Sequence, residues 1–99
     1  MAAPEIGILA LIEAKPGKGP DLRELLKNAR ELAAAEEGTV DWYAFKVNDE
    51  TYGIFDTFDS EDSRIAHLNG EITKALAKVG GELLAREPDI QTIDIVAVK

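Results

Sequence analysis

His67 is the only histidine in this chain of 99 residues, so its imidazole is the only side chain whose ordinary pKa lies close to neutral pH. Such a group can act as a general base toward a phenolic proton. On a regular helix, however, the apolar stripe of the surrounding segment lies almost opposite His67. The alternative interpretation is a solvated helix face, unless a break at Asn69-Gly70 turns His67 toward the rim of a pocket.

Asp56 occupies an unusual position for a carboxylate. In an alternating strand it shares its face with Tyr52 and Phe58, so we expect it among apolar neighbours. A carboxylate that is removed from water is suited to proton transfer. The alternative is an ion pair, either with Lys46 on the adjacent strand or with Arg64 at the start of the following helix, because structural ion pairs also perturb carboxylates.

All six aromatic residues fall in two neighbouring segments, at Trp42, Tyr43, Phe45, Tyr52, Phe55 and Phe58. Together they could form a slot for a flat aromatic ligand, held by offset stacking and by hydrogen bonds to its phenol groups. The side chains expected to shape this slot are Trp42, Tyr52, Phe55 and Phe58. Arg64 or Asn69 would stabilise negative charge on the ligand. For any single aromatic, the alternative is an ordinary place in the core or in a subunit interface.

The composition excludes several classes of protein. At 45% hydrophobic residues the chain is too apolar to be disordered, and without cysteine it has no thiolate nucleophile, disulfide or thiolate metal site. No cluster of other ligands suggests a bound metal. A net charge of −8 opposes binding to nucleic acids and to anionic membranes, and no apolar run is long enough to span a bilayer. The first residues lack the basic segment of a secretory signal, so we expect a cytoplasmic protein.

The segments around these residues predict an α+β domain. Residues 6–14 are strand-like, and residues 20–35 carry apolar side chains at helical spacing. Residues 42–47 and 51–58 are rich in strand formers and flank a short polar turn, which predicts an antiparallel hairpin.

A second helix is predicted from Ser60, which can cap it, to Val79, with Gly70 as a weak point inside it. Gly80-Gly81 is expected to kink the chain before a last strand at residues 90–98. The resulting order β-α-β-β-α-β is that of a ferredoxin-like antiparallel sheet with two helices. We expect residues 1–99 to form a single domain.

Both faces of the predicted sheet are apolar. In the first strand, Ile8 and Ala10 alternate with Leu9 and Leu11. Two helices cover only one face of such a sheet, so the other face would be left to water. An open apolar face of this size is an association surface, and it predicts a homodimer in which two sheets cover each other.

Several short motifs occur at matching places in this layout: Ala14-Lys15-Pro16-Gly17-Lys18, Glu36-Glu37-Gly38-Thr39, Thr57-Phe58-Asp59-Ser60, Ala66-His67-Leu68 and Glu87-Pro88. With them, nearly the whole chain resembles the antibiotic biosynthesis monooxygenase domain family of dimeric α+β barrels. The resemblance is strongest to a branch whose third strand reads as Tyr52 to Phe58 does here.

The resemblance implies oxidation of a phenolic or quinol-type molecule by molecular oxygen, with neither a metal ion nor a flavin. His67, which coincides with the family histidine, or Asp56 would accept the phenolic proton, in a pocket between the hairpin and the second helix. The sequence departs from the family at Phe58, where many members have tryptophan, and at Asp56, where glutamate is usual. The alternative function is a dimeric small-molecule binding or stress-response protein that uses the same barrel without chemistry.

Overall fold

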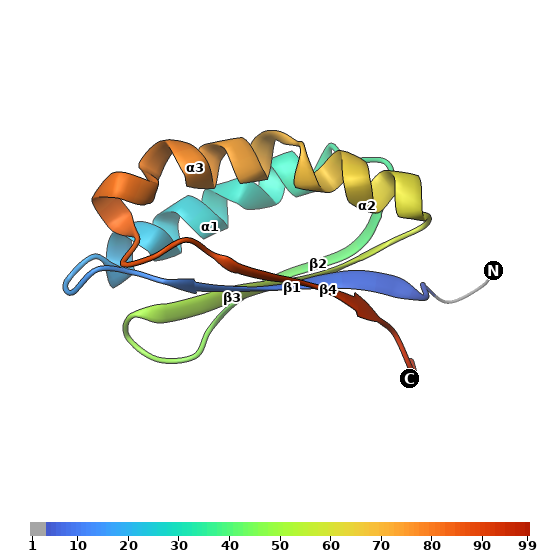
Figure 1. Ribbon diagram of the computed structural model, residues 1–99, viewed down its shortest axis with the longest axis horizontal. Coiled ribbons are helices and arrows are strands. Elements are labelled where there is room, and N and C mark those ends of the chain that lie inside the picture. The colour runs from blue at the N-terminus through green and yellow to red at the C-terminus, as the bar shows by residue number, and fades with distance from the viewer. Residues whose placement is uncertain (1–3) are drawn as a thin grey trace.

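A four-stranded antiparallel sheet carries the helices on one of its faces (Figure 1). The computed structural model describes residues 4–99. The elements are β1 (Ile6–Glu13), α1 (Gly19–Ala34), β2 (Thr39–Lys46), β3 (Thr51–Phe58), α2 (Glu61–Leu68), α3 (Glu71–Leu83) and β4 (Asp89–Asp94). Within this described part of the chain, no helix has both the length and the hydropathy to cross a membrane.

The strands lie in the order β2-β3-β1-β4, with β3 and β1 in the centre. In this register, Asp56 is paired with Ile8 on β1 and with Trp42 on β2. Sheet order and element order together are those of the ferredoxin-like α+β fold, which confirms the fold class predicted from the sequence.

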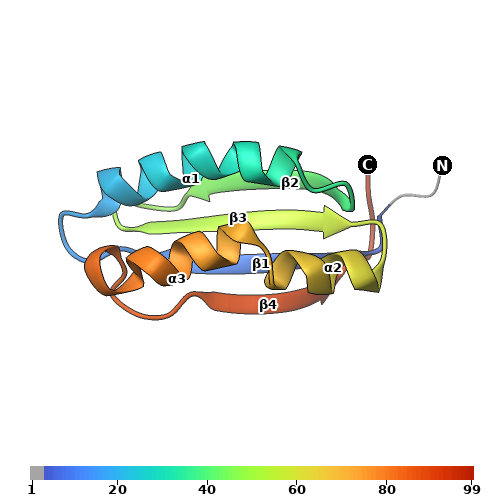
Figure 2. The same cartoon turned by 90° about the horizontal axis from the view of Figure 1, so that it is seen from above.

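The core lies between the helices and one face of the sheet. Seen from above, α1 runs over the β2 side of the sheet, and α2 and α3 run over β1 (Figure 2). The side chains that α1 buries there recur at helical spacing, at Leu22, Leu26, Ala29 and Ala33. The strands contribute alternate residues to the same layer, including Ile8, Ile12, Ile54 and Asp56.

The second helix is broken, so the prediction of one helix from Ser60 to Val79 is wrong. Gly70 adopts an extended backbone conformation (φ −92°, ψ −169°), and α3 begins only after it. Ser60 caps α2 as predicted, since its hydroxyl accepts a hydrogen bond of 3.1 Å from the backbone N–H of Ser63. The break changes which side of the helix faces inward: His67 is only 7% exposed, whereas Ile65 is 48% exposed.

Two further boundaries differ from the sequence prediction. Gly80-Gly81 lies inside α3 rather than at a kink, because the helix continues until Leu83. The last strand ends at Asp94 instead of Val98; beyond it, the backbone N–H of Ile95 still donates to the carbonyl of Glu5 over 2.7 Å. The types of glycine and apolar residues alone do not fix the residue at which a helix or a strand ends.

The face of the sheet away from the helices is apolar along the centre of β1 and the hairpin, as predicted, but polar along β4, where Gln91 and Asp89 lie opposite Leu9 and Leu11. It carries Leu9 and Leu11 from β1, and Tyr43 and Phe55 from the hairpin. The Tyr43 and Phe55 rings stack with their centroids 6.4 Å apart, yet Tyr43 remains 59% exposed. Figure 1 shows no helix on this side of the sheet.

Candidate active site: a histidine between two carboxylates

Three elements bring one imidazole and two carboxyl groups together. Asp56 comes from the middle of β3, His67 from the last turn of α2, and Glu36 from the turn between α1 and β2. His67 Nδ1 lies 2.7 Å from Glu36 Oε1, and His67 Nε2 lies 2.9 Å from Asp56 Oδ2. The side chain of Asp56 has no exposed surface, that of His67 is 8% exposed and that of Glu36 is 24% exposed. The three groups therefore run from the interior to the surface.

Two side-chain contacts and one glycine hold these three groups in place. The ring of Phe58 packs against the His67 ring with centroids 5.1 Å apart. The hydroxyl of Thr39 donates a 2.7 Å hydrogen bond to Glu36 Oε1, the oxygen that also contacts His67. Gly38 lies so close to α2 that a Cβ there would overlap the Ser63 side chain. The turn can approach His67 because this position has no side chain.

The two carboxyl groups determine the charge state of the imidazole. Burial by itself lowers the pKa of His67, but the contacts and negative charges of Asp56 and Glu36 outweigh burial and raise the pKa above its ordinary value of 6.5. Ionised carboxylates only accept hydrogen bonds, so two of them around one ring favour the form in which both nitrogens carry hydrogen.

Asp56 is incompletely satisfied in this arrangement. The 2.9 Å contact with His67 Nε2 engages Oδ2, and the other oxygen, Oδ1, has no hydrogen-bond partner within residues 4–99. Buried polar atoms without partners are uncommon in folded proteins. Asp56 therefore has the capacity to accept a hydrogen bond or a proton from a ligand.

The largest of the described pockets lies on the side of α1 and is lined by none of the three site residues. It has a volume of about 660 Å³ and lies between α1 and the hairpin, with Trp42 and Tyr52 among its lining residues. Because Trp42 also pairs with Asp56 across the sheet, Trp42 stands between the pocket and the carboxylate. The indole Nε1 of Trp42 is buried without a hydrogen-bond partner in the described residues.

The pocket predicted between the hairpin and the second helix corresponds to a smaller one of about 310 Å³, where His67 and Asn69 meet Glu36 and Thr39, the first residue of β2. Asp56 and Phe58 are buried and do not line it. Because the helix is broken after α2, the His67 side chain is buried in the interior. The largest pocket lies elsewhere, between α1 and the hairpin.

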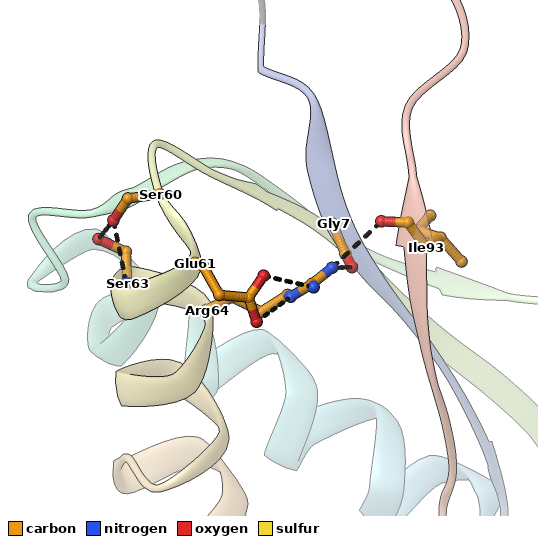
Figure 3. A network of polar contacts seen from close by, with 6 residues as sticks. All are labelled: Gly7, Ser60, Glu61, Ser63, Arg64 and Ile93. Atoms are coloured by element: carbon orange, nitrogen blue, oxygen red, sulfur yellow. Dashed lines mark hydrogen bonds and ion pairs between the residues drawn. The ribbon is translucent and has the colours of Figure 1, made fainter.

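Arg64 and Asn69 have structural partners away from the largest pocket. Arg64 Nη1 donates to the backbone carbonyls of Gly7 and Ile93 over 3.2 and 3.3 Å, and its Nη2 pairs with Glu61 (Figure 3). Asn69 Nδ2 donates to the carbonyl of Ile65 at the end of α2. These hydrogen bonds connect α2 to the neighbouring strands β1 and β4.

Neither partner that the sequence suggested for Asp56 pairs with it. Lys46 pairs with Asp49 over 3.2 Å instead, and Arg64 is engaged as described above. Of the predicted aromatics, Trp42 and Tyr52 line the largest pocket and Phe58 packs against His67. Phe55 lies on the opposite face of the sheet and does not line this pocket, whereas Phe45, from the edge strand β2, does.

Sequence reasoning missed Glu36 as a site residue. It is 31 positions from His67, so no local pattern connects the two. The sequence feature that could have indicated Glu36 is the motif Glu36-Glu37-Gly38-Thr39, in which two acids precede a glycine and a hydroxyl residue. Among residues 4–99, no group of acidic or histidine side chains is arranged to hold a metal ion.

Comparisons with known proteins agree with this fold. Residues 6–79 match the family model described as antibiotic biosynthesis monooxygenase. A solved structure of a protein of unknown function from Nitrosomonas europaea is 40% identical, with a TM-score of 0.94, and the match covers 97% of this chain and 93% of that one. No protein of curated function matches the chain.

More distant structures share the fold alone. Protein PA3566 from Pseudomonas aeruginosa is 17% identical, with a TM-score of 0.82 and coverage of 98% of this chain and 99% of that one. A Caulobacter crescentus protein, provisionally named an antibiotic biosynthesis monooxygenase, is 22% identical, with a TM-score of 0.78 and coverage of 95% and 92%.

The sheet order and the buried site define a ferredoxin-like α+β domain with a carboxylate–imidazole row under its helices. The family match makes the assignment more specific. The chain belongs to the antibiotic biosynthesis monooxygenase family, as the motifs in the sequence indicated.

Proposed function

We propose that this protein is a cofactor-independent monooxygenase that oxidises a phenolic or quinol-type molecule with molecular oxygen. The observation that carries the proposal is Asp56, a fully buried carboxylate with one oxygen, Oδ1, that has no partner in the described residues, beside the only histidine of the chain. A desolvated carboxylate next to an imidazole is a suitable acceptor for a phenolic proton.

In this proposal the substrate occupies the pocket between α1 and the hairpin, and its hydroxyl reaches Asp56 past Trp42. The indole ring must move aside for this contact. The unpartnered Nε1 of Trp42 supports such a movement, because a buried donor without an acceptor costs about 1–3 kcal/mol. A substrate oxygen would supply the missing acceptor.

His67 acts as a relay rather than as the first base. Both of its ring nitrogens already face carboxyl groups, which leaves no free nitrogen for a substrate. Above the raised pKa of His67, where the ring carries its single proton on Nδ1, a proton accepted by Asp56 can pass to Nε2 while Nδ1 releases its own proton to Glu36. Glu36 is 24% exposed and can return that proton to water.

The chemistry balances without an external reductant. In an anthrone-type phenol, a ring CH₂ becomes C=O, which removes four electrons from the substrate. Oxygen accepts these four electrons: one atom enters the product as the carbonyl oxygen and the other leaves as water with both hydrogens. Asp56 begins the sequence by taking the proton, and the electron-rich anion then reacts with oxygen.

The homodimer predicted from the sequence is part of this proposal. The open face of the sheet carries Leu9, Leu11, Tyr43 and Phe55, and no helix formed by residues 4–99 covers it. Contiguous apolar surfaces of this kind mark association sites. A second copy, with its own open face, is the occupant that the sheet-on-sheet arrangement favours.

One observation favours the alternative, a binding protein without chemistry. Asp56 has no exposed surface, so the row of charges could simply join β3, α2 and the turn before β2. A structural role of this kind would not require a substrate to reach the carboxylate.

Oxygen uptake separates the two functions. Metal-free protein is mixed with anthrone or a naphthoquinol, and uptake above the spontaneous rate is measured by electrode. We expect turnover that falls about 100-fold or more in Asp56→Asn, and that is unchanged in Asp62→Asn, whose carboxylate lies exposed at the start of α2. Saturable quenching of the Trp42 fluorescence without any oxygen uptake would instead support the binding protein.

A further inference from the structure

Four cations surround the pocket between α1 and the hairpin. Arg23, Lys27 and Arg30 recur at intervals of four and three residues, so they lie along one side of α1. Lys46 approaches from β2, on the face of the sheet that the helices cover. No Asp or Glu of residues 4–99 lines this pocket.

This accumulation of positive charge runs against the composition of the chain. The sequence has 19 acidic residues and only 11 Lys and Arg, with a net charge of −8. A pocket lined by four cations and no acid therefore differs sharply from the rest of the molecule. The local field will concentrate anions there even though the protein as a whole repels them.

The cations are free to serve a ligand. Lys27 pairs with Glu24 over 3.7 Å and Arg30 with Glu31 over 3.0 Å, and in both pairs each side chain is more than 60% exposed. Lys46 pairs with an almost fully exposed Asp49. Exposed pairs of this kind contribute little to stability and exchange readily with other partners. Arg23 forms no ion pair within residues 4–99.

The rest of the pocket suits a flat aromatic molecule. Trp42 and Tyr52 line it together with the apolar side chains of Leu26 and Ala44. The indole Nε1 of Trp42, which is buried without a hydrogen-bond partner in the described residues, is a further donor that a ligand could use once the ring moves. The volume of about 660 Å³ lies within the range of small-molecule sites.

From these features we infer that the ligand of this pocket is a planar aromatic anion: a phenol that carries a carboxylate or a similar acidic group. Its acidic group lies among Arg23, Lys27, Arg30 and Lys46, and its ring lies against Trp42. This orientation directs the phenolic hydroxyl inward, to the side where Asp56 lies. The inference rests on the proposed function for its choice of pocket, and it adds the charge of the substrate.

Binding without oxygen tests this inference separately from catalysis. The probes are 6-hydroxy-2-naphthoate, whose hydroxyl and carboxylate lie at opposite ends of the ring system, and 2-naphthol, which differs only by the missing carboxylate; their affinities are measured by titration calorimetry under anaerobic conditions at low salt. We expect the anion to bind at least 10-fold more tightly than the neutral phenol. The preference should shrink as sodium chloride is added, because salt screens exposed charges.

Variants that remove positive charge test whether the pocket cations cause the preference for the anionic probe. The double variant Arg23→Gln, Arg30→Gln should lose most of the preference for the anion while it still binds 2-naphthol. The matched control is Lys78→Gln, Lys99→Gln, which removes the same charge from exposed residues outside the pocket and should keep the preference. Equal affinity for the two probes, or an equal loss in both double variants, would overturn the inference.

The two proposals fail in different ways. Selective binding of the naphthoate with no oxygen uptake on any phenol would refute the monooxygenase and leave the anion site intact. Oxygen uptake on neutral quinols with no preference for the naphthoate would refute the anion site and leave the monooxygenase intact.

Discussion

The Nε2 atom of His67 lies 2.9 Å from Oδ2 of Asp56, a carboxylate with no exposed surface. Two charged groups in the interior lose their hydration, and their mutual attraction repays that loss only with good geometry. Removal of one partner leaves the other charge buried and alone, which typically costs about 3–5 kcal/mol. This contact therefore matters for folding as well as for the proposed proton transfer.

The protonation of His67 should make stability depend on pH. Its pKa is raised in the folded protein, so the stabilising contribution is fully present below pH 6.5 and is lost as the pH rises through the raised pKa. Urea unfolding at a series of pH values should show this decline above neutrality. In His67→Gln the same range should be flat, apart from changes shared with other groups.

The same pKa can be observed directly, because one histidine gives one set of imidazole signals in a proton NMR titration. We expect a midpoint above 6.5 in the folded protein. A midpoint below that value would contradict the arrangement of two ionised carboxylates around the ring.

Glu36 should contribute to that raised pKa. Glu36→Gln keeps the size of the side chain but removes one negative charge beside Nδ1, so the midpoint of His67 should fall toward its ordinary value. Glu37→Gln is the matched control, because Glu37 is the adjacent exposed acid and does not contact His67. If both variants shift the midpoint equally, the effect comes from the general field rather than from the contact.

Gly38 lies in the turn that carries Glu36, and Gly80, inside α3, is a glycine for comparison. Gly38→Ala should destabilise the fold, by about 1–3 kcal/mol, because the added methyl group overlaps Ser63. Gly80→Ala should instead stabilise the protein by about 0.5–1 kcal/mol, since Gly80 is helical and has open space around it. Thermal unfolding of both variants gives the sign of each change. A neutral Gly38→Ala would show that the turn can move away from α2.

The open face of the sheet should mediate the proposed dimer. A carboxylate introduced on that face by Tyr43→Asp, in the edge strand β2, should convert a dimer to a monomer at micromolar concentration, as measured by light scattering. Leu32→Asp, on the exposed side of α1, is the control and should not change the mass. A monomeric native protein would contradict the proposal at once.

Much of the fold could be predicted because it depends on local patterns. The two-residue period of a strand placed Asp56 on the face of Tyr52 and Phe58, and the structure confirms this face. The apolar spacing of α1 and the cap at Ser60 were equally readable. Each of these features is decided by residues that are close together in the sequence.

The site itself was less predictable, because its contacts are distant or depend on one break. A regular helix turns His67 outward, and only the extended backbone at Gly70 separates α2 from α3 and allows the inward direction. Arg64 was expected to face a ligand, but its partners are backbone carbonyls of β1 and β4, which no pattern of side chains reveals. Glu36 enters from another turn 31 residues away.

The proton relay is the central claim, and oxygen uptake by Glu36→Gln and Glu37→Gln tests it most directly. With anthrone as substrate, the initial rate is recorded by electrode from pH 6 to pH 9 for the two variants and the native protein. We predict a rate at least 10-fold lower in Glu36→Gln, with an altered pH profile, and a native rate in Glu37→Gln. Equal rates and profiles in all three proteins would contradict the relay.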